Sequence, residues 1–136
     1  MNLKRFSILA SIVFLAALSS SAQSAEITKD SLETVQKKIA DKQAVLVDVR
    51  EKSEWDDGHV DGAIFLPLSA LQKGVGAKEL AKQLPKDKII YTHCVVGKRA
   101  LAAGNILEKL GYEVRALKPG YKELVKAGFK KVDDQQ

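Results

Sequence analysis

The chain has 136 residues, of which 46% are hydrophobic and 29% are charged, a composition typical of one globular domain rather than of a disordered chain. Its net charge of +5 comes from 22 basic and 17 acidic residues, and the lysines are scattered among the acids. This scatter argues against a nucleic-acid partner, because such a partner needs clustered basic side chains.

The N-terminus has the layout of a secretory signal peptide. Lys4 and Arg5 form a positively charged start, residues 8–18 are almost entirely apolar, and a run of small residues follows. The apolar core has about 11 residues, whereas a helix that spans a bilayer needs about 20. We therefore expect residues 1–25 to be a cleaved leader rather than a membrane anchor.

Cleavage is expected after Ala22 or Ala25, and residues 26–136 then form the mature domain. Loss of the leader leaves 20 basic and 17 acidic residues, so the net charge falls to +3. The predicted location is the periplasm, with no stable membrane insertion once the leader has been removed.

The first elements of the mature chain are a helix and a strand. Thr28 or Asp30 is expected to cap a helix that ends near Asp41. Residues 44–49 form a nearly continuous apolar run, which is typical of a parallel strand that is covered on both faces.

A polar turn is predicted over residues 50–58, with Trp55 packed beneath it as part of the core. Glycines punctuate residues 58–63, and residues 64–67 are read as a second strand that Pro67 closes.

The second half continues the alternation of strands and helices. The expected elements are a short turn capped by Ser69, a helix over residues 77–84, a strand over 88–93, a helix from 98 or 99 to 110 with Gly111 as its C-cap, a last strand over 112–117 and a final helix over 121–127. This order predicts an α/β fold with a mostly parallel sheet, whose functional site lies beyond the carboxyl ends of the strands.

The only cysteine, Cys94, directly follows the strand predicted over residues 88–93. It has no partner for an internal disulfide. The backbone N–H groups of the short loop that follows favour negative charge, and Lys98 and Arg99 add positive charge. Gly97 permits the bend. We therefore expect Cys94 to be a reactive thiolate nucleophile rather than an inert buried thiol.

Several stretches in combination resemble the rhodanese family of sulfurtransferases. They are residues 46–51 with Glu54, residues 58–64 with Pro67, residues 91–99, and residues 110–112. The resemblance covers about residues 36–132. The exported single-domain form is similar to the small periplasmic rhodaneses of the phage-shock-protein E type.

The resemblance implies a three-layer rhodanese-like fold, with helices on both faces of the sheet, and thiosulfate sulfurtransferase activity without a cofactor. Cys94 would take the outer sulfur of thiosulfate or a similar anionic donor as a persulfide, and a thiophilic acceptor such as cyanide or a thiol would remove it. A separate thiol reductant is an expected partner. The loop that would bind the persulfide comprises Val95, Val96, Gly97, Lys98 and Arg99.

Supporting roles are assigned to Asp48, Arg50, Glu54 and His59. Arg50 is expected to pair with Asp48 or Glu54 rather than to bind substrate, and His59 to stabilise a turn. The chain departs from the family pattern in three places. Ala100 replaces a frequent Ser or Thr, Glu54 stands near an arginine of thiosulfate-using members, and residues 119–120 keep only part of a glycine-rich packing motif.

Three other functions were weighed. A metal site at His59, His93 and Cys94 is disfavoured because their spacing matches no zinc pattern. A cysteine-dependent phosphatase or arsenate reductase needs arginine one position after Arg99. A persulfide carrier without turnover of its own stays open.

Overall fold

The computed structural model describes residues 24–133. The expected leader therefore lies almost wholly outside the described residues, together with the cleavage point after Ala22. Within residues 24–133, no helix is both long enough and apolar enough to cross a bilayer.

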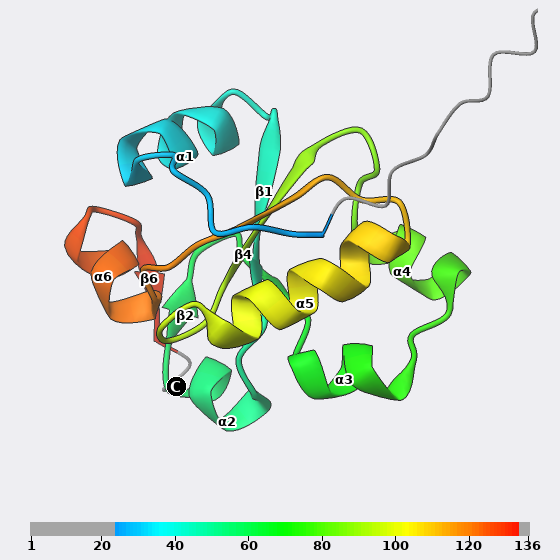
Figure 1. The fold of residues 1–136 in the computed structure, drawn as a ribbon. Coiled ribbons are helices and arrows are strands. Elements are labelled where there is room, and N and C mark those ends of the chain that lie inside the picture. The colour runs from blue at the N-terminus through cyan, green and yellow to red at the C-terminus, as the bar shows by residue number, and fades with distance from the viewer. Residues whose placement is uncertain (1–23, 134–136) are drawn as a thin grey trace, which may run out of the picture.

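Four parallel strands form the central sheet, as the sequence predicts (Figure 1). In spatial order they are β3 (Ile64–Phe65), β1 (Ala44–Asp48), β4 (Ile89–His93) and β5 (Val114–Ala116). In the register of the two central strands Asp48 lies beside His93, so the segments that begin at Val49 and Cys94 leave the same edge of the sheet.

Helices cover both faces of this sheet, which confirms the three-layer α/β prediction (Figure 1). One face packs against α3 (Leu68–Lys73), α4 (Ala77–Gln83) and α5 (Lys98–Lys109). The other packs against α1 (Leu32–Ala40) and α6 (Tyr121–Lys126). The alternation of strand side chains between the two faces explains why β1 and β4 are nearly continuous apolar runs.

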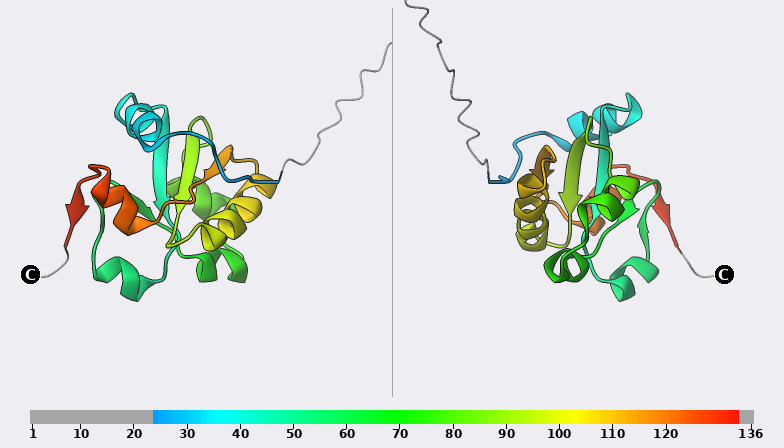
Figure 2. Two further views of the ribbon diagram at one scale, coloured as in Figure 1. Left: turned by 60° about the vertical axis from the view of Figure 1, so that its left-hand side comes forward. Right: turned by 90° about the vertical axis from the view of Figure 1, so that its right-hand side faces the viewer.

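Two pairings have no counterpart in the sequence prediction. The segment around Ile27 pairs in parallel with Ala116 of β5, so it extends the edge of the sheet. The two-residue strands β2 (His59–Val60) and β6 (Lys131–Val132) form a separate antiparallel pair, so the predicted last strand is not the last. Figure 2 shows β6 at one side of the molecule, away from the central strands.

Some local predictions were wrong. Ser31, not Thr28 or Asp30, caps α1, because its hydroxyl accepts the N–H of Thr34 at 3.1 Å. Pro67, not Ser69, precedes α3.

The predicted polar turn contains a short helix, α2 (Lys52–Asp56), which a capping box between Glu51 and Glu54 stabilises. Trp55 on this helix is half-buried rather than part of the core, and its ring stacks on His59 with centroids 3.6 Å apart.

Candidate active site

The Cys94 sulfur lies at the centre of the loop between β4 and α5. Cys94 is 1% exposed. Its Sγ atom accepts hydrogen bonds from the N–H of Gly97 at 3.2 Å and from the N–H of Ala100 at 3.4 Å. Two backbone donors therefore converge on one sulfur, an arrangement that stabilises negative charge at that atom.

Gly97 gives this loop its bend. Its φ of +95° is in the left-handed region that glycine adopts freely. A Cβ at this position would also stand 3.1 Å from the Cα of Lys118, so the loop lies against the segment that follows β5. Both observations support the role that the sequence gives to Gly97.

Gly120, the residue before α6, contributes to the site although no sequence prediction assigns it a role. A Cβ there would stand 2.1 Å from the Val95 carbonyl oxygen and 2.8 Å from that of Cys94. The next residue, Tyr121, donates its N–H to the Cys94 carbonyl at 3.2 Å. Residues 119–120 therefore pack closely against the loop, although they keep only part of the glycine-rich packing motif of the family. In the sequence, only the Pro-Gly pair before a helix marks this position.

Arg99 does not stand free beside the thiol. Its two terminal nitrogens donate to both carboxylate oxygens of Glu54, at 2.6 and 2.9 Å. This hydrogen-bonded pairing lowers the pKa of Glu54 to about 2 and raises that of Arg99. The positive charge expected to attract an anionic donor is thus balanced by a carboxylate from α2.

Arg50 is buried and pairs with Asp48, one of the two partners that the sequence allowed. Its Nη2 atom lies 2.7 Å from Asp48 Oδ2 and donates to the Gly58 carbonyl at 2.8 Å. The guanidinium also lies 4.5 Å from the centre of the Tyr121 ring. Arg50 therefore ties the end of β1 to α6, as expected of a structural residue.

His93 is fully buried beside this cluster, and neither of its ring nitrogens has a hydrogen-bond partner among residues 24–133. Burial lowers its pKa to about 4, although the carboxylate of Asp48 acts in the opposite direction. His93 is therefore uncharged at neutral pH. Its 3.6 Å approach to Asp48 is a close contact rather than an ion pair.

His59 contacts α2. Its Nδ1 atom lies 3.1 Å from the Trp55 carbonyl oxygen. Within residues 24–133, no three His, Cys, Asp or Glu side chains are grouped closely enough to hold a metal ion.

A cleft of about 470 Å³ adjoins the Cys94 loop. Val95 and Val96 form its apolar side and are 49% and 65% exposed. Lys98 is also exposed. The remaining lining residues are Arg50, Glu54, Asp57, Tyr121, Lys122 and Glu123. The structure therefore brings the loop residues, Arg50 and Glu54 to one edge of the sheet, whereas Asp48 is fully buried and His59 packs against Trp55.

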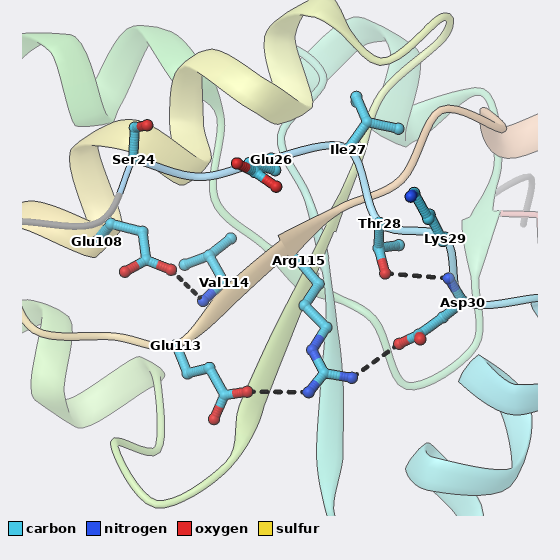
Figure 3. A pocket seen from close by; sticks show the side chains of 10 residues that line it. All are labelled: Ser24, Glu26, Ile27, Thr28, Lys29, Asp30, Glu108, Glu113, Val114 and Arg115. Atoms are coloured by element: carbon cyan, nitrogen blue, oxygen red, sulfur yellow. Dashed lines mark hydrogen bonds and ion pairs between the residues drawn. The ribbon is translucent and has the colours of Figure 1, made fainter.

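A second cavity, of about 540 Å³, lies between the N-terminal segment and β5 (Figure 3). Arg115 points into it and pairs with Asp30 at 2.8 Å and Glu113 at 3.1 Å. The Glu108 carboxylate accepts the N–H of Val114. These groups satisfy one another, which is typical of an edge that holds the N-terminal segment in place.

Comparison with known proteins gives matches in both sequence and structure. Residues 31–127 match the family model described as the rhodanese-like domain. The chain is 40% identical over 67 residues to the probable adenylyltransferase/sulfurtransferase MoeZ of Mycobacterium tuberculosis, which covers 49% of this chain but 16% of that protein. It is 32% identical over 90 residues to human thiosulfate:glutathione sulfurtransferase, which covers 60% of this chain and 78% of that protein.

Solved structures are similar as well. A human single-domain sulfurtransferase aligns with a TM-score of 0.57 at 27% identity, covering 71% of this chain and 94% of that one. A rhodanese with anions from E. coli aligns with a TM-score of 0.53 at 25% identity, covering 66% of this chain and 98% of that one.

Proposed function

We propose that this chain, which belongs to the rhodanese-like domain family, is a sulfurtransferase that works through a persulfide on Cys94. The named relatives support a general sulfurtransferase or sulfur-carrier role. The observation that carries the proposal is the pair of backbone N–H groups, from Gly97 and Ala100, that converge on the sulfur. They stabilise the thiolate before the reaction and the persulfide anion after it.

The proposed donor is thiosulfate or a similar sulfane-sulfur compound. The Cys94 thiolate attacks the outer sulfur, a new S–S bond forms, and the original S–S bond breaks with its electron pair leaving on sulfite. A thiophilic acceptor, cyanide or a thiolate, then attacks the outer sulfur of the persulfide. That second attack returns the electron pair to Cys94 and completes the cycle.

The close fit of the loop favours sulfur over phosphorus chemistry. Cys94 is 1% exposed, and both amides are directed at its single sulfur atom. Arg99, the cation that a phosphate would need, is held by Glu54. These observations favour sulfur transfer over the phosphatase and arsenate reductase alternatives.

We also propose that the protein acts in the periplasm after removal of its leader, as in the phage-shock-protein E type, and that a thiol reductant keeps Cys94 reduced there. The layout of residues 1–25 supports export. A free reactive thiol in an oxidising compartment is open to mixed disulfides, which supports the need for a reductant.

Steady-state thiocyanate formation from thiosulfate and cyanide tests the proposal. We expect many turnovers per chain and none in Cys94→Ala. The Lys82→Ala variant removes an exposed side chain of α4 that pairs with Glu79, and it is the control that should stay active.

Two other outcomes would each replace the proposal. One equivalent of thiocyanate per chain, with no turnover for any sulfane donor, would identify a carrier. Phosphate release from an aryl phosphate that disappears in Cys94→Ser would identify a phosphatase.

A further inference from the structure

The large hydrophobic side chains that are exposed in the described part of the chain gather around the Cys94 loop. They are Ile27, Val95 and Val96, with exposed fractions of 39%, 49% and 65%. Val95 and Val96 directly follow Cys94. The Ile27 Cδ1 atom lies 3.4 Å from the point that a Cβ on Gly97 would occupy. We call these three residues the apolar rim.

The backbone on either side of Ile27 is fixed. The Glu26 carbonyl accepts the N–H of Ala116 at 3.1 Å, and the N–H of Thr28 donates to the Ala116 carbonyl at 2.8 Å. These bonds hold Ile27 beside the loop, although it is 67 positions before Cys94 in the sequence. A small inorganic anion gains nothing from such a rim, whereas exposed apolar groups around a reactive atom are typical of a protein contact.

The charges around the apolar rim are mostly positive. Lys122 lines the cleft with Val95 and Val96, Lys118 lies against Gly97, and Lys98 begins α5. None of these three lysines forms an ion pair within residues 24–133. Of the acidic residues in the cleft, Glu54 is paired with Arg99, whereas Glu123 and Asp57 keep their negative charge and are outnumbered by the three lysines.

We propose that the apolar rim docks a partner protein whose cysteine is flanked by apolar and acidic residues, and that this cysteine accepts the sulfur from Cys94. The proposal rests on the persulfide chemistry proposed above. The partner's thiolate, its proton released to solvent, attacks the outer persulfide sulfur. The bond between that sulfur and Cys94 Sγ breaks, the electron pair returns to Cys94, and the partner leaves as a persulfide.

Burial of the thiol is compatible with this transfer. Cys94 itself is 1% exposed, but an S–S bond carries the transferable sulfur about 2 Å beyond Sγ. An acceptor cysteine therefore needs to reach the loop opening rather than its floor. Apolar neighbours of that cysteine would contact the rim, and acidic ones would face the three lysines.

Three synthetic cysteine peptides test the proposal against the full mature chain loaded with sulfur by thiosulfate. Their cysteines are flanked by leucine and glutamate, by leucine and lysine, or by serine and glutamate. We expect the first peptide to discharge the persulfide about fivefold faster than either of the others. Each rate is divided by the rate of discharge by cyanide for the same protein.

Two variants test whether a preference among the peptides arises from the apolar rim and the lysines around it. Ile27→Ser should abolish the advantage of leucine over serine flanks, and Lys122→Glu should favour the lysine peptide. The control is Lys78→Glu on α4, which packs on the face of the sheet opposite α6 and Lys122, and it should keep the wild-type order. Equal normalised rates for all peptides would overturn the docking surface while leaving the persulfide chemistry intact. If no sulfur loads onto Cys94, the proposed function fails, and the docking proposal falls with it.

Sedimentation of the wild type and of Val96→Ser distinguishes a second occupant of the surface. We expect both to sediment as monomers. A wild-type dimer that Val96→Ser dissociates would assign the apolar rim to a second copy of this chain and overturn the proposal.

Discussion

The charge next to the Cys94 sulfur is set by a residue from a distant part of the chain. The sequence places Arg99 at the start of a helix, where a positive side chain is disfavoured and an anion nearby is therefore expected. The anion is the Glu54 carboxylate, 45 positions away. No pattern in one sequence reveals which carboxylate reaches which arginine over that separation. The position of Cys94 after an apolar strand, by contrast, was predictable because it depends only on local order.

The pairing predicts a selective effect of Glu54 on anionic donors. In Glu54→Gln the amide oxygen can still accept the N–H of Glu51, so the cap of α2 is kept, while the negative charge is lost. We expect kcat/KM for thiosulfate to rise about three- to tenfold at low salt, because Arg99 becomes available to the dianion.

The matched control is Asp56→Asn, which removes a carboxylate from the same helix that is paired only with Lys52. It should leave kcat/KM unchanged. A lower kcat/KM in Glu54→Gln would mean that the carboxylate positions Arg99 for the reaction rather than shielding it, and an unaltered value would mean that the pairing does not limit the use of thiosulfate.

At the scale of elements, long regular segments were predictable and short paired ones were not. Apolar runs in the sequence predict β1 and β4, and helical spacing of apolar residues predicts α5. The two-residue strands β2 and β6 are too short to show a hydrophobic periodicity, and these two paired strands are far apart in the sequence. The same holds for Ile27 against β5. The packing of α6 on the loop was missed because its signal is the absence of a side chain at Gly120.

Gly120→Ala should therefore damage both stability and activity. The new methyl group would meet the Val95 carbonyl oxygen at 2.1 Å, so the loop or the start of α6 must move. We expect a loss of about 1–3 kcal/mol in the free energy of unfolding and a reduced kcat for thiocyanate formation.

Gly76→Ala is the comparison variant. A Cβ at Gly76 meets no atom within 4 Å, and we expect a change below about 1 kcal/mol. Chemical denaturation of both proteins measures the difference. If Gly120→Ala matched Gly76→Ala in stability and activity, the close packing of α6 on the loop would not matter.

At the scale of the whole molecule, the parallel sheet brings two strand ends together and buries a polar cluster beneath them. The α/β alternation predicted this common edge, because parallel strands end on the same side. It did not predict that His93 would be enclosed without a hydrogen-bond partner in the described part of the chain. Enclosure depends on which elements pack over the end of β4, and the pattern of a single strand does not encode that.

Stability should consequently depend on pH through His93. Its pKa is lowered to about 4 by burial, whereas in the unfolded chain it is about 6.5. Between these values the unfolded chain binds more protons than the folded one, so stability rises with pH. Above about pH 6.5, His93 is neutral in both the folded and the unfolded chain and does not lower the free energy of unfolding. As the pH falls to about 4, we expect the free energy of unfolding to drop by on the order of 3 kcal/mol.

Denaturation at several pH values measures this slope. His93→Leu should flatten it between about pH 6.5 and 4, and His59→Gln, which keeps His93, should not. NMR titration of the His93 ring in the wild type checks the same point without a mutation. A midpoint near 6.5 would contradict the burial argument.

The proposed function depends on the formation of a persulfide on Cys94, so the covalent state of this sulfur atom is the most direct test. Intact-protein mass is measured after incubation with thiosulfate and again after addition of cyanide. We predict a gain of one sulfur atom per chain, its removal by cyanide, and no gain in Cys94→Ala. An unchanged mass with thiosulfate and with every other sulfane donor, or a sulfur that persists in Cys94→Ala, would contradict the account.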